Sequence, residues 1–388
     1  MSSPKQVVII GGGYVGIQFA QELAKHLPAS QAKITVIEKN EFTFHSIGVP
    51  RAYVDPSYVS KLFIPLSNAL PASHSTWVHG IADTIQPRRV LVRRIVDNRV
   101  DDFTSSIPYD YLILAMGSSY TFPIKVPAET FSRGNVENAV VDIANCIKAA
   151  TSVVVIGGGP VGIEVAGQIA AAYPQTSVTI VEKNTSLIKH AEVTKKFRTK
   201  LMKKLEALNV AVVLGQSIPR SLVENGFGCK TLITNRGTMI ESDVRLVCTG
   251  MERNSYLVKK LDPTLVNSSG AVKVTATMQL DDSRFPNVYA IGDVSDHPSP
   301  KLAFTGILQG IHLAKQLATV IKKGTGTVAP FAASGPDVMF VPLGPHGGVG
   351  QFPIFGGIVA GDMMVRTIKG NDYYASYLWS MWNARLPK

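Results

Sequence analysis

Two runs of glycine, each with an acidic residue further along the chain, are the residues whose type and spacing predict chemistry most directly. Each run has the pattern GxGxxG, in which the first glycine permits a tight turn and the second lets the backbone approach a pyrophosphate. The third glycine lets a helix pack closely on a strand, and the N-terminus of that helix attracts phosphate. The residues are Gly11, Gly13, Gly16 and Glu38 in the first run, and Gly157, Gly159, Gly162 and Glu182 in the second. Each run therefore predicts a site for a dinucleotide.

The two acidic residues indicate what each site prefers. Glu38 is expected to accept hydrogen bonds from the adenosine ribose hydroxyls at the first site. Glu182 would repel the 2′-phosphate of NADPH, which favours NADH at the second site, while Lys183 directly after it leaves NADPH as an alternative. The glycines could instead serve only helix–strand packing, but two complete copies in one chain make this the weaker interpretation.

The elements around the two runs repeat as well. Val7–Ile17 recurs as Val153–Ile163, and each copy passes from a β-branched strand through the glycine turn into an alanine-rich helix. Each copy then returns to a strand before Glu-Lys-Asn, expected at Ile34–Ile37 and Val178–Val181. Two short apolar segments that end in glycine match each other as closing strands: Tyr111–Gly117 and Val244–Gly250. Since two copies are too few for a solenoid, we predict an α/β fold with two Rossmann-like dinucleotide-binding domains.

The composition indicates a folded chain of two or three domains with an anionic partner. The 388 residues are 45% hydrophobic and 17% charged, which excludes a disordered chain. Lys and Arg number 39 against 28 Asp and Glu, and the net charge of +11 suits a dinucleotide, a phospholipid surface or nucleic acid. Cys146, Cys229 and Cys248 are widely spaced without a CxxC pair, so we expect no disulfide framework and no thiol metal site.

The N-terminus and the apolar segments predict a protein that is not secreted. Met1–Lys5 leads directly into an apolar run, which leaves no room for a signal peptide, and Ser2 excludes N-myristoylation. The longest stretch without a charged side chain, 338–361, contains seven glycines and three prolines and cannot form a continuous spanning helix. We therefore expect a cytoplasmic protein, with attachment to the surface of a membrane such as the mitochondrial outer membrane or a lipid droplet left open.

Two dinucleotide sites in one chain suggest two dinucleotides that exchange electrons, usually a retained flavin and a diffusing nicotinamide. Asn287–Asp293 is an apolar strand that ends in glycine and aspartate. It resembles the late FAD motif of flavoproteins with two dinucleotide sites, where the aspartate binds the ribityl chain. Asp293 could alternatively cap the helix that begins near Leu302. We assign the first site to FAD and the second to the nicotinamide.

With these motifs, the chain resembles the apoptosis-inducing-factor and ferroptosis-suppressor-protein group of NAD(P)H:quinone oxidoreductases, relatives of the type II NADH dehydrogenases. The resemblance covers nearly the whole length, and its matching stretches are Arg51–Ile64, Ala115–Ser118, Gly159–Glu164, Asn287–Lys301, Gly347–Gln351 and Met364–Lys369. It implies cofactor contacts at Gly11, Gly12, Gly13, Tyr14, Val15, Gly16, Glu38, Lys39, Arg51, Val78, Ala115, Gly117, Asp293 and Lys301. It also implies FAD with NADH or NADPH as cofactors, and a quinone such as ubiquinone as substrate.

The expected domains are discontinuous. Residues 1–120 and 284–325 form the FAD-binding domain, and residues 121–283 form the NAD(P)H-binding domain inserted between them. Residues 326–388 form a C-terminal region that completes the site for flavin and quinone.

The resemblance also places Glu164 and Lys369 beside the flavin ring as catalytic candidates. A cation there stabilises the negative charge of a ring reduced by hydride, and Lys369 is a candidate for it. Quinone reduction consumes protons, which a Glu–Lys pair with shifted pKa values can relay. Two plainer interpretations stay open: Glu164 as a carboxylate favoured near a helix N-terminus, and Lys369 as an ordinary surface lysine.

Three further features bear on cofactors and partners. Met116 stands where the group usually has threonine, which alters a hydrogen bond on the flavin side. Between Val193 and Leu208 the apolar residues follow helical spacing, and lysines at the other positions predict a solvated basic face. An aromatic-rich end lies either at a bilayer interface or packed against the flavin domain. It consists of Tyr373, Tyr374, Tyr377, Leu378, Trp379, Met381, Trp382 and Arg385.

The sequence leaves several acceptors open. Without a cysteine pair, electrons are expected to pass directly from flavin to the acceptor. A ubiquinone-type quinone leads, a specialised natural-product quinone or aromatic ketone is second, and a small iron–sulfur or haem protein is third. A redox sensor that binds nucleic acid is the alternative of another class, but no helix-turn-helix, zinc finger or basic sheet with interleaved aromatics supports it. An oligomer is left open, and no metal site is predicted.

Overall fold

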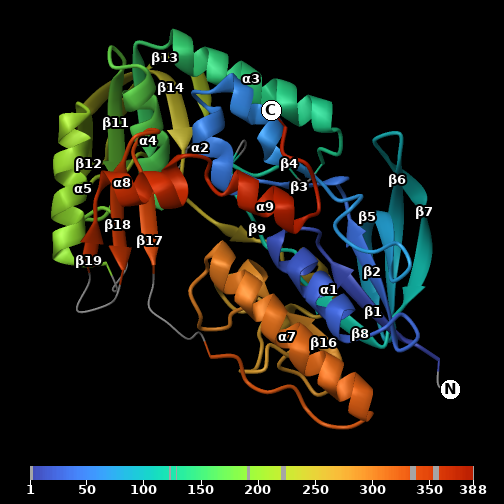
Figure 1. Cartoon of the computed structure of the whole chain (residues 1–388). Coiled ribbons are helices and arrows are strands. Elements are labelled where there is room, and N and C mark those ends of the chain that lie inside the picture. Colours follow the sequence, from blue (N-terminus) through green and yellow to red (C-terminus); the bar gives the residue numbers. More distant parts are fainter. Residues whose placement is uncertain are drawn as a thin grey trace.

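The computed structural model describes residues 3–121, 124–127, 129–189, 193–219, 224–332, 338–352 and 358–387. They form two α/β units and a C-terminal segment that crosses from one unit to the other (Figure 1). Pro353, one of the prolines in the uncharged stretch 338–361, lies outside the described residues. In the part of the chain that is described, no helix combines the length and the apolar character needed to cross a bilayer.

The first unit is built on a seven-stranded sheet in the order β16-β8-β1-β2-β5-β6-β7. The first five strands in this order run parallel, and β5, β6 and β7 form an antiparallel meander. Helices α1 (Tyr14–His26) and α7 (Ala303–Lys323) pack side by side on one face, where Phe19 and Leu313 share a core (Figure 1). The strands are β1 (Lys5–Ile10), β2 (Ala32–Glu38), β5 (Ser75–Gln86), β6 (Arg89–Val96), β7 (Arg99–Pro108), β8 (Tyr111–Leu114) and β16 (Val288–Ala290).

The second unit repeats the plan on a five-stranded sheet in the order β12-β11-β10-β14-β13, in which only β13 is antiparallel. Its strands are β10 (Ser152–Ile156), β11 (Ser177–Glu182), β12 (Val210–Leu214), β13 (Gly226–Ile233) and β14 (Met239–Val247). Its helices are α3 (Arg133–Ala149), α4 (Pro160–Ala172) and α5 (Lys195–Ala207). The helix expected between Val193 and Leu208 is confirmed as α5, and it buries Phe197, Leu201 and Leu205.

The two glycine runs form the same turn in both units. The first glycine has φ of +111° at Gly11 and +121° at Gly157, a conformation that side chains disfavour. A Cβ on Gly16 or Gly162 would lie 2.0 Å from the carbonyl oxygen of that first glycine, so each helix approaches its turn closely. The two βαβ units and the α/β fold with two Rossmann-like units are therefore confirmed.

A short antiparallel pair, β9 (Ser118–Ser119) with β15 (Glu252–Arg253), connects the two units. The chain after β15 packs against the first sheet, because Leu257 of α6 (Tyr256–Leu261) and Leu265 lie in its core. We therefore propose that the first unit resumes near residue 254, earlier than the expected position 284.

The C-terminal segment forms a small sheet and three helical pieces that contact both units. The sheet has the order β17-β18-β19, with β17 (Met339–Pro342), β18 (Gly348–Phe352) and β19 (Ile358–Ala360). It is followed by α8 (Asp362–Val365), a π-helical turn (Arg366–Gly370) and α9 (Ala375–Met381). The sheet lies against α4 and α5 of the second unit, and α9 reaches the first unit (Figure 1).

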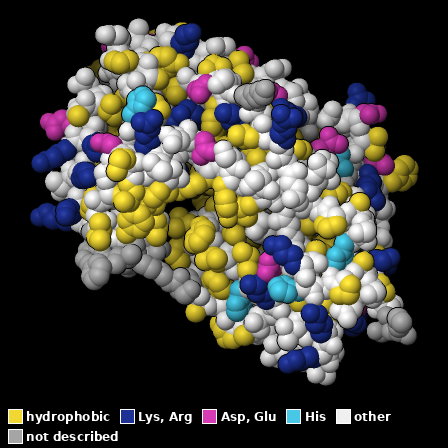
Figure 2. Space-filling model, in the orientation of Figure 1, with side chains coloured by type: hydrophobic (Ala, Val, Ile, Leu, Met, Phe, Trp, Pro, Cys, Tyr) yellow, Lys and Arg dark blue, Asp and Glu magenta, His cyan; other side chains and the backbone are white. Residues whose placement is uncertain are grey.

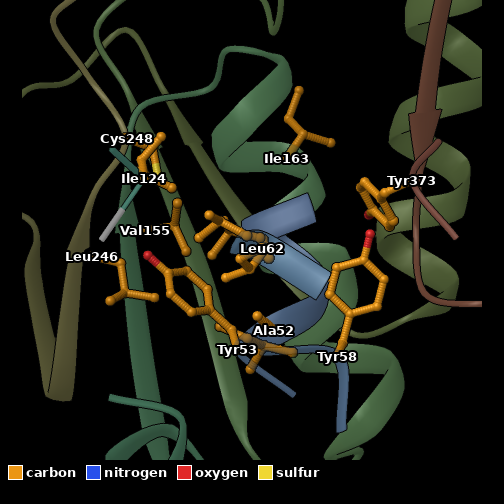
Figure 3. Close-up of a cluster of buried hydrophobic side chains, with 14 of the residues drawn as sticks. Ala52, Tyr53, Tyr58, Leu62, Ile124, Val155, Ile163, Leu246, Cys248 and Tyr373 are labelled. Atoms are coloured by element: carbon orange, nitrogen blue, oxygen red, sulfur yellow. The ribbon is translucent and has the colours of Figure 1, made fainter. Parts of the chain in front are cut away.

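One apolar core is continuous across the two units and the C-terminal segment. Tyr53, which follows α2 (Val49–Ala52), and Leu62 belong to the first unit, whereas Val155 and Leu246 belong to the second sheet. Figure 3 shows these side chains together, with Tyr58 and Tyr373 meeting at one side. The strands β3 (Phe42–Phe44) and β4 (Phe63–Pro65) border this core. Because the interface is apolar and buried, the two units are held in a fixed relative position.

Candidate active site

The glycine turns leave open space at the N-termini of α1 and α4. A Cβ built on Gly13 or Gly159, the N-cap residues, would have no atom within 4 Å, and neither helix has a side-chain cap. The N-termini of both helices, with their partial positive charge, therefore face open space at these glycines, as binding of a pyrophosphate there requires. This open space is compatible with the dinucleotide sites that the spacing of the glycines predicts.

Glu38 and Glu182 each hold the glycine turn of their own unit. Glu38 Oε2 accepts from the Gly12 N–H at 2.6 Å, and its Oε1 accepts from the Asn40 N–H at 3.1 Å. Glu182 does the same with the N–H groups of Gly158 at 2.7 Å and Asn184 at 2.8 Å. Burial raises the pKa of Glu38. A carboxylate has about four acceptor sites, so both retain sites for ribose hydroxyls. This structural role of the two carboxylates is one that the sequence analysis missed.

Ala115 and Val15, two of the residues expected to contact the first cofactor, lie beside the first glycine turn. A Cβ on Gly11 would lie 2.4 Å from the carbonyl oxygen of Ala115, and one on Gly292 would lie 3.2 Å from the Val15 side chain. Gly117, the third residue after β8, has φ of +63°, and Val78 is buried on β5, beside Ile37.

Asp293 lies in a 3₁₀ turn, Gly292–Val294, and takes part in a small polar cluster. Ser118 Oγ donates to Asp293 Oδ2 at 2.7 Å, and Lys125 Nζ donates to both oxygens of Ser118 at 2.7 Å. The alternative role of Asp293 as a helix cap is wrong, because α7 has Leu302 at its N-cap and no side-chain cap. Lys125 was missed because its place beside Asp293 depends on the tertiary fold.

Two further lysines predicted at the cofactor site bind backbone carbonyls. Lys39 Nζ donates to the carbonyl of Pro127, and Lys301 Nζ donates to the carbonyl of His297 at 2.8 Å. Burial lowers the pKa of both lysines. The structure therefore shows these two lysines bound to backbone carbonyls of the chain itself, and their contact with a cofactor stays a prediction.

Glu164 and Lys369 form a buried ion pair, although 205 residues separate them. Lys369 Nζ lies 2.6 Å from Glu164 Oε1, and the two side chains are 14% and 6% exposed. Lys369 also donates to the carbonyl of Phe340 at 3.3 Å. Burial raises the pKa of Glu164, and the charge of Lys369 opposes that rise. The plainer interpretations are wrong: Lys369 is not a surface lysine, and Glu164 lies beyond the first turn of α4 rather than at its N-terminus.

A second set of side-chain contacts, called here the second rung, lies four residues further along the chain from each member of the ion pair. It joins Gln168, which follows Glu164 on α4, to Tyr373, which follows Lys369. Gln168 of α4 donates from Nε2 to the Tyr373 hydroxyl at 2.8 Å and accepts from Arg51 Nε at 3.1 Å. Arg51 Nη2 donates to the Gly370 carbonyl at 2.7 Å and its guanidinium lies over the Tyr373 ring. This network fixes the π-helical turn that carries Lys369. Arg51 was expected to contact the cofactor, but the links through Gln168 and Tyr373 were missed.

A buried chain of hydrogen bonds leads away from the first glycine turn. Tyr14 Oη lies 2.9 Å from His45 Nδ1, and His45 Nε2 lies 3.2 Å from Tyr58 Oη. Tyr58 donates to the Asp372 carbonyl at 2.7 Å, so it accepts from His45, and Tyr14 donates to His45. Burial lowers the pKa of His45 to about 4, which keeps the ring neutral at physiological pH.

Most of the rings of the aromatic end are packed inside the molecule. Tyr373 and Trp382 are fully buried, Trp382 Nε1 donates to Thr43 Oγ1 at 2.8 Å, and Trp379 Nε1 donates to the Lys61 carbonyl at 3.0 Å. The packed alternative therefore holds for Tyr373, Trp379 and Trp382, whereas Tyr377 is 61% exposed. The contacts of α9 hold the C-terminal segment against the first unit.

The fold defines a class of protein, the α/β oxidoreductases that have two Rossmann-type dinucleotide units. The family of pyridine nucleotide-disulphide oxidoreductases matches residues 5–310, and the chain belongs to this family. Proteins of this family generally bind FAD and NAD(P)H. Cys146, Cys229 and Cys248 are all free thiols in the structure.

Known proteins resemble the chain over nearly its whole length. Apoptosis-inducing factor homolog B of Dictyostelium discoideum is 29% identical over 90% of this chain and 90% of its own. Ferroptosis suppressor protein 1 of Homo sapiens is 27% identical over 97% of this chain and 96% of its own. In fold, the sulfide:quinone oxidoreductase of Aquifex aeolicus matches with a TM-score of 0.75 at 16% identity, over 98% of this chain and 92% of its own. The resemblance expected from the sequence is confirmed.

Proposed function

We propose that this protein is an FAD-dependent NAD(P)H:quinone oxidoreductase that prefers NADH. The overall reaction is NADH + H⁺ + quinone → NAD⁺ + quinol, which transfers two electrons and consumes one proton. The observation that carries the proposal is the buried pair of Glu164 with Lys369, which joins the helix after the second glycine turn to the C-terminal segment. A quinone reductase needs a cation and a proton source at such a junction.

The open cradles at Gly13 and Gly159 fit the pyrophosphates of two dinucleotides, which supports FAD in the first unit and NADH in the second. Glu182 at the end of β11 disfavours a 2′-phosphate and supports NADH. When bound, FAD would supply the capacity to take a hydride from the nicotinamide and to pass the electrons on to an acceptor.

Within the chain, Lys369 is proposed to stabilise negative charge and to donate a proton to a quinone oxygen. The contacts of Nζ with Glu164 and with the Phe340 carbonyl orient the ammonium group. Burial raises the pKa of Glu164, which favours its protonated form, and we propose this carboxyl as the group that returns a proton to Lys369. Gln168 and Arg51 act as positioning residues, because they fix Tyr373 and the turn around Lys369.

The test follows the absorbance of oxidised flavin in the purified holoprotein under anaerobic conditions. NADH is added first and a water-soluble short-chain ubiquinone second. We expect bleaching by NADH and prompt recovery with the quinone. Bleaching without recovery would overturn the quinone assignment and favour another acceptor, such as an aromatic ketone or a redox protein. The absence of bleaching would overturn the proposed reaction with NADH.

Lys369→Met supplies a test of the catalytic pair. We expect normal bleaching by NADH but slow reoxidation by quinone. Lys204→Met is the matched control, because Lys204 forms an ion pair of the same 2.6 Å length with Asp362, whose side chain is 55% exposed. Equal reoxidation rates in the two variants would remove Lys369 from the proposed mechanism.

A further inference from the structure

The C-terminal sheet and α8 carry an exposed apolar patch, formed by Val338, Ile358, Met363 and Met364. These side chains are 47%, 50%, 82% and 44% exposed. The register of the sheet places Val338 and Ile358 at the same end, on either side of Phe352. Figure 2 shows hydrophobic side chains gathered over β17, β18, β19 and α8.

A row of lysines on α5 borders this patch. Lys195, Lys196 and Lys203 are exposed, and their spacing places them along one side of the helix, on either side of Thr199. Two neighbouring lysines contact the patch's own elements: Lys200 Nζ donates to the Ala360 carbonyl at 3.3 Å, and Lys204 pairs with Asp362. These contacts hold α5, which carries the lysine row, against the elements that carry the apolar patch.

The same surface lies next to the candidate active site. The π-helical turn that carries Lys369 begins directly after α8, and Lys369 donates to the carbonyl of Phe340 in β17. Figure 2 shows the molecule hollowed between the hydrophobic side chains over α8 and a second hydrophobic group beside them. An apolar substrate that approaches across this surface would have a short path toward Lys369.

We propose that the apolar patch and the lysine row together dock the protein on an anionic phospholipid bilayer. The apolar side chains would enter the interface, while the lysines would meet anionic headgroups. The two tryptophans of the aromatic end cannot provide this contact, because Trp379 and Trp382 are buried. That a quinone is drawn from this bilayer rests on the proposed function, whereas the docking itself does not.

The charges set the size of the expected effect. A lysine near an anionic membrane surface strengthens binding by about fivefold, so removing Lys195, Lys196 and Lys203 is expected to weaken binding by about a hundredfold. Salt should weaken the binding too, because the lysines are exposed to solvent.

The experiment is sedimentation of the full-length holoprotein with phosphatidylcholine vesicles, with and without phosphatidylserine. One variant combines Lys195→Ala, Lys196→Ala and Lys203→Ala, and another is Met363→Asp. The matched controls are Lys322→Ala with Lys323→Ala at the exposed end of α7, and Phe103→Asp, whose side chain is 81% exposed on β7. All substituted side chains are exposed, so equal melting temperatures will show that the variants fold.

We expect binding to vesicles with phosphatidylserine, lost in both patch variants and kept in both controls. No binding by the unchanged protein, or equal losses in the control variants, would overturn the proposal. Equal binding to vesicles without phosphatidylserine would also overturn it, because the lysine row would then have no role.

Turnover separates docking from the proposed function. With NADH as donor, the patch variants should lose reduction of a long-chain quinone embedded in the vesicles but keep reduction of a soluble short-chain quinone. Vesicle binding without any quinone reduction would leave the docking supported and overturn the proposed function. Quinone reduction without vesicle binding would support the proposed function and overturn the docking.

Discussion

Lys369→Met should destabilise the protein at alkaline pH and much less at acidic pH. The substitution leaves the Glu164 carboxyl buried without its counter-charge, since 6% of that side chain is exposed in the pair. Removing one partner of a buried pair costs about 3–5 kcal/mol when the other stays charged. This cost disappears when the Glu164 carboxyl is protonated and therefore neutral, and burial already raises its pKa.

The sign follows from proton linkage. A carboxyl whose pKa is raised by folding is accommodated without cost when protonated, and the cost appears as the pH rises through the raised pKa. The entropy of unfolding is about 0.8 kcal/mol/K for a chain of this length, so a loss of about 3–5 kcal/mol lowers Tm by about 4–6 °C. We expect this decrease at pH 9 and a smaller one at pH 5.

The assay is thermal unfolding of the holoprotein, followed by near-UV circular dichroism from pH 5 to pH 9. Lys204→Met again serves as the control, because breaking its exposed pair with Asp362 costs about 0–1 kcal/mol at any of these pH values. The double variant Glu164→Gln/Lys369→Met should regain most of the lost Tm at pH 9. Equal decreases for Lys369→Met at pH 5 and pH 9 would refute the reasoning.

Three other predictions address the glycine turn, the buried histidine and the second rung. Gly157→Ala should lower Tm, because the φ of +121° at this position is unfavourable for a residue with a side chain. Gly159→Ala should leave Tm unchanged, because a Cβ there would meet no atom of the protein. The same Cβ would fill the open space at the N-terminus of α4, so the Kd for NADH measured by titration should rise about tenfold or more. Between pH 6.5 and pH 4 the unfolded chain protonates His45 while the folded protein, in which its pKa is about 4, does not, so the free energy of unfolding falls by about 3 kcal/mol over this range. His45→Asn removes this group, so the decrease of Tm over the same pH range should be smaller in the variant. Tyr373→Phe removes the hydroxyl that Gln168 binds and should cost about 1–3 kcal/mol, measured as Tm, while slowing quinone turnover more than it changes NADH affinity. An unchanged Tm and turnover in Tyr373→Phe would contradict the role of the second rung.

The sequence alone determined the two dinucleotide units, because their signals are local. A turn that requires positive φ at Gly11 and Gly157 is encoded within a few residues, and the strands and helices that follow show their periods directly. The apolar spacing of α5 was sufficient for the same reason.

The tertiary structure alone decided which residues meet across the chain. Glu164 and Lys369 are 205 residues apart, and Trp382 meets Thr43 across 339. Whether a glutamate, a lysine or an aromatic ring is buried depends on elements that pack from elsewhere, so the sequence left two interpretations open for each. Lys125 and Gln168 carried no local signal, because their partners are brought to them only when the two units and the C-terminal segment share one core.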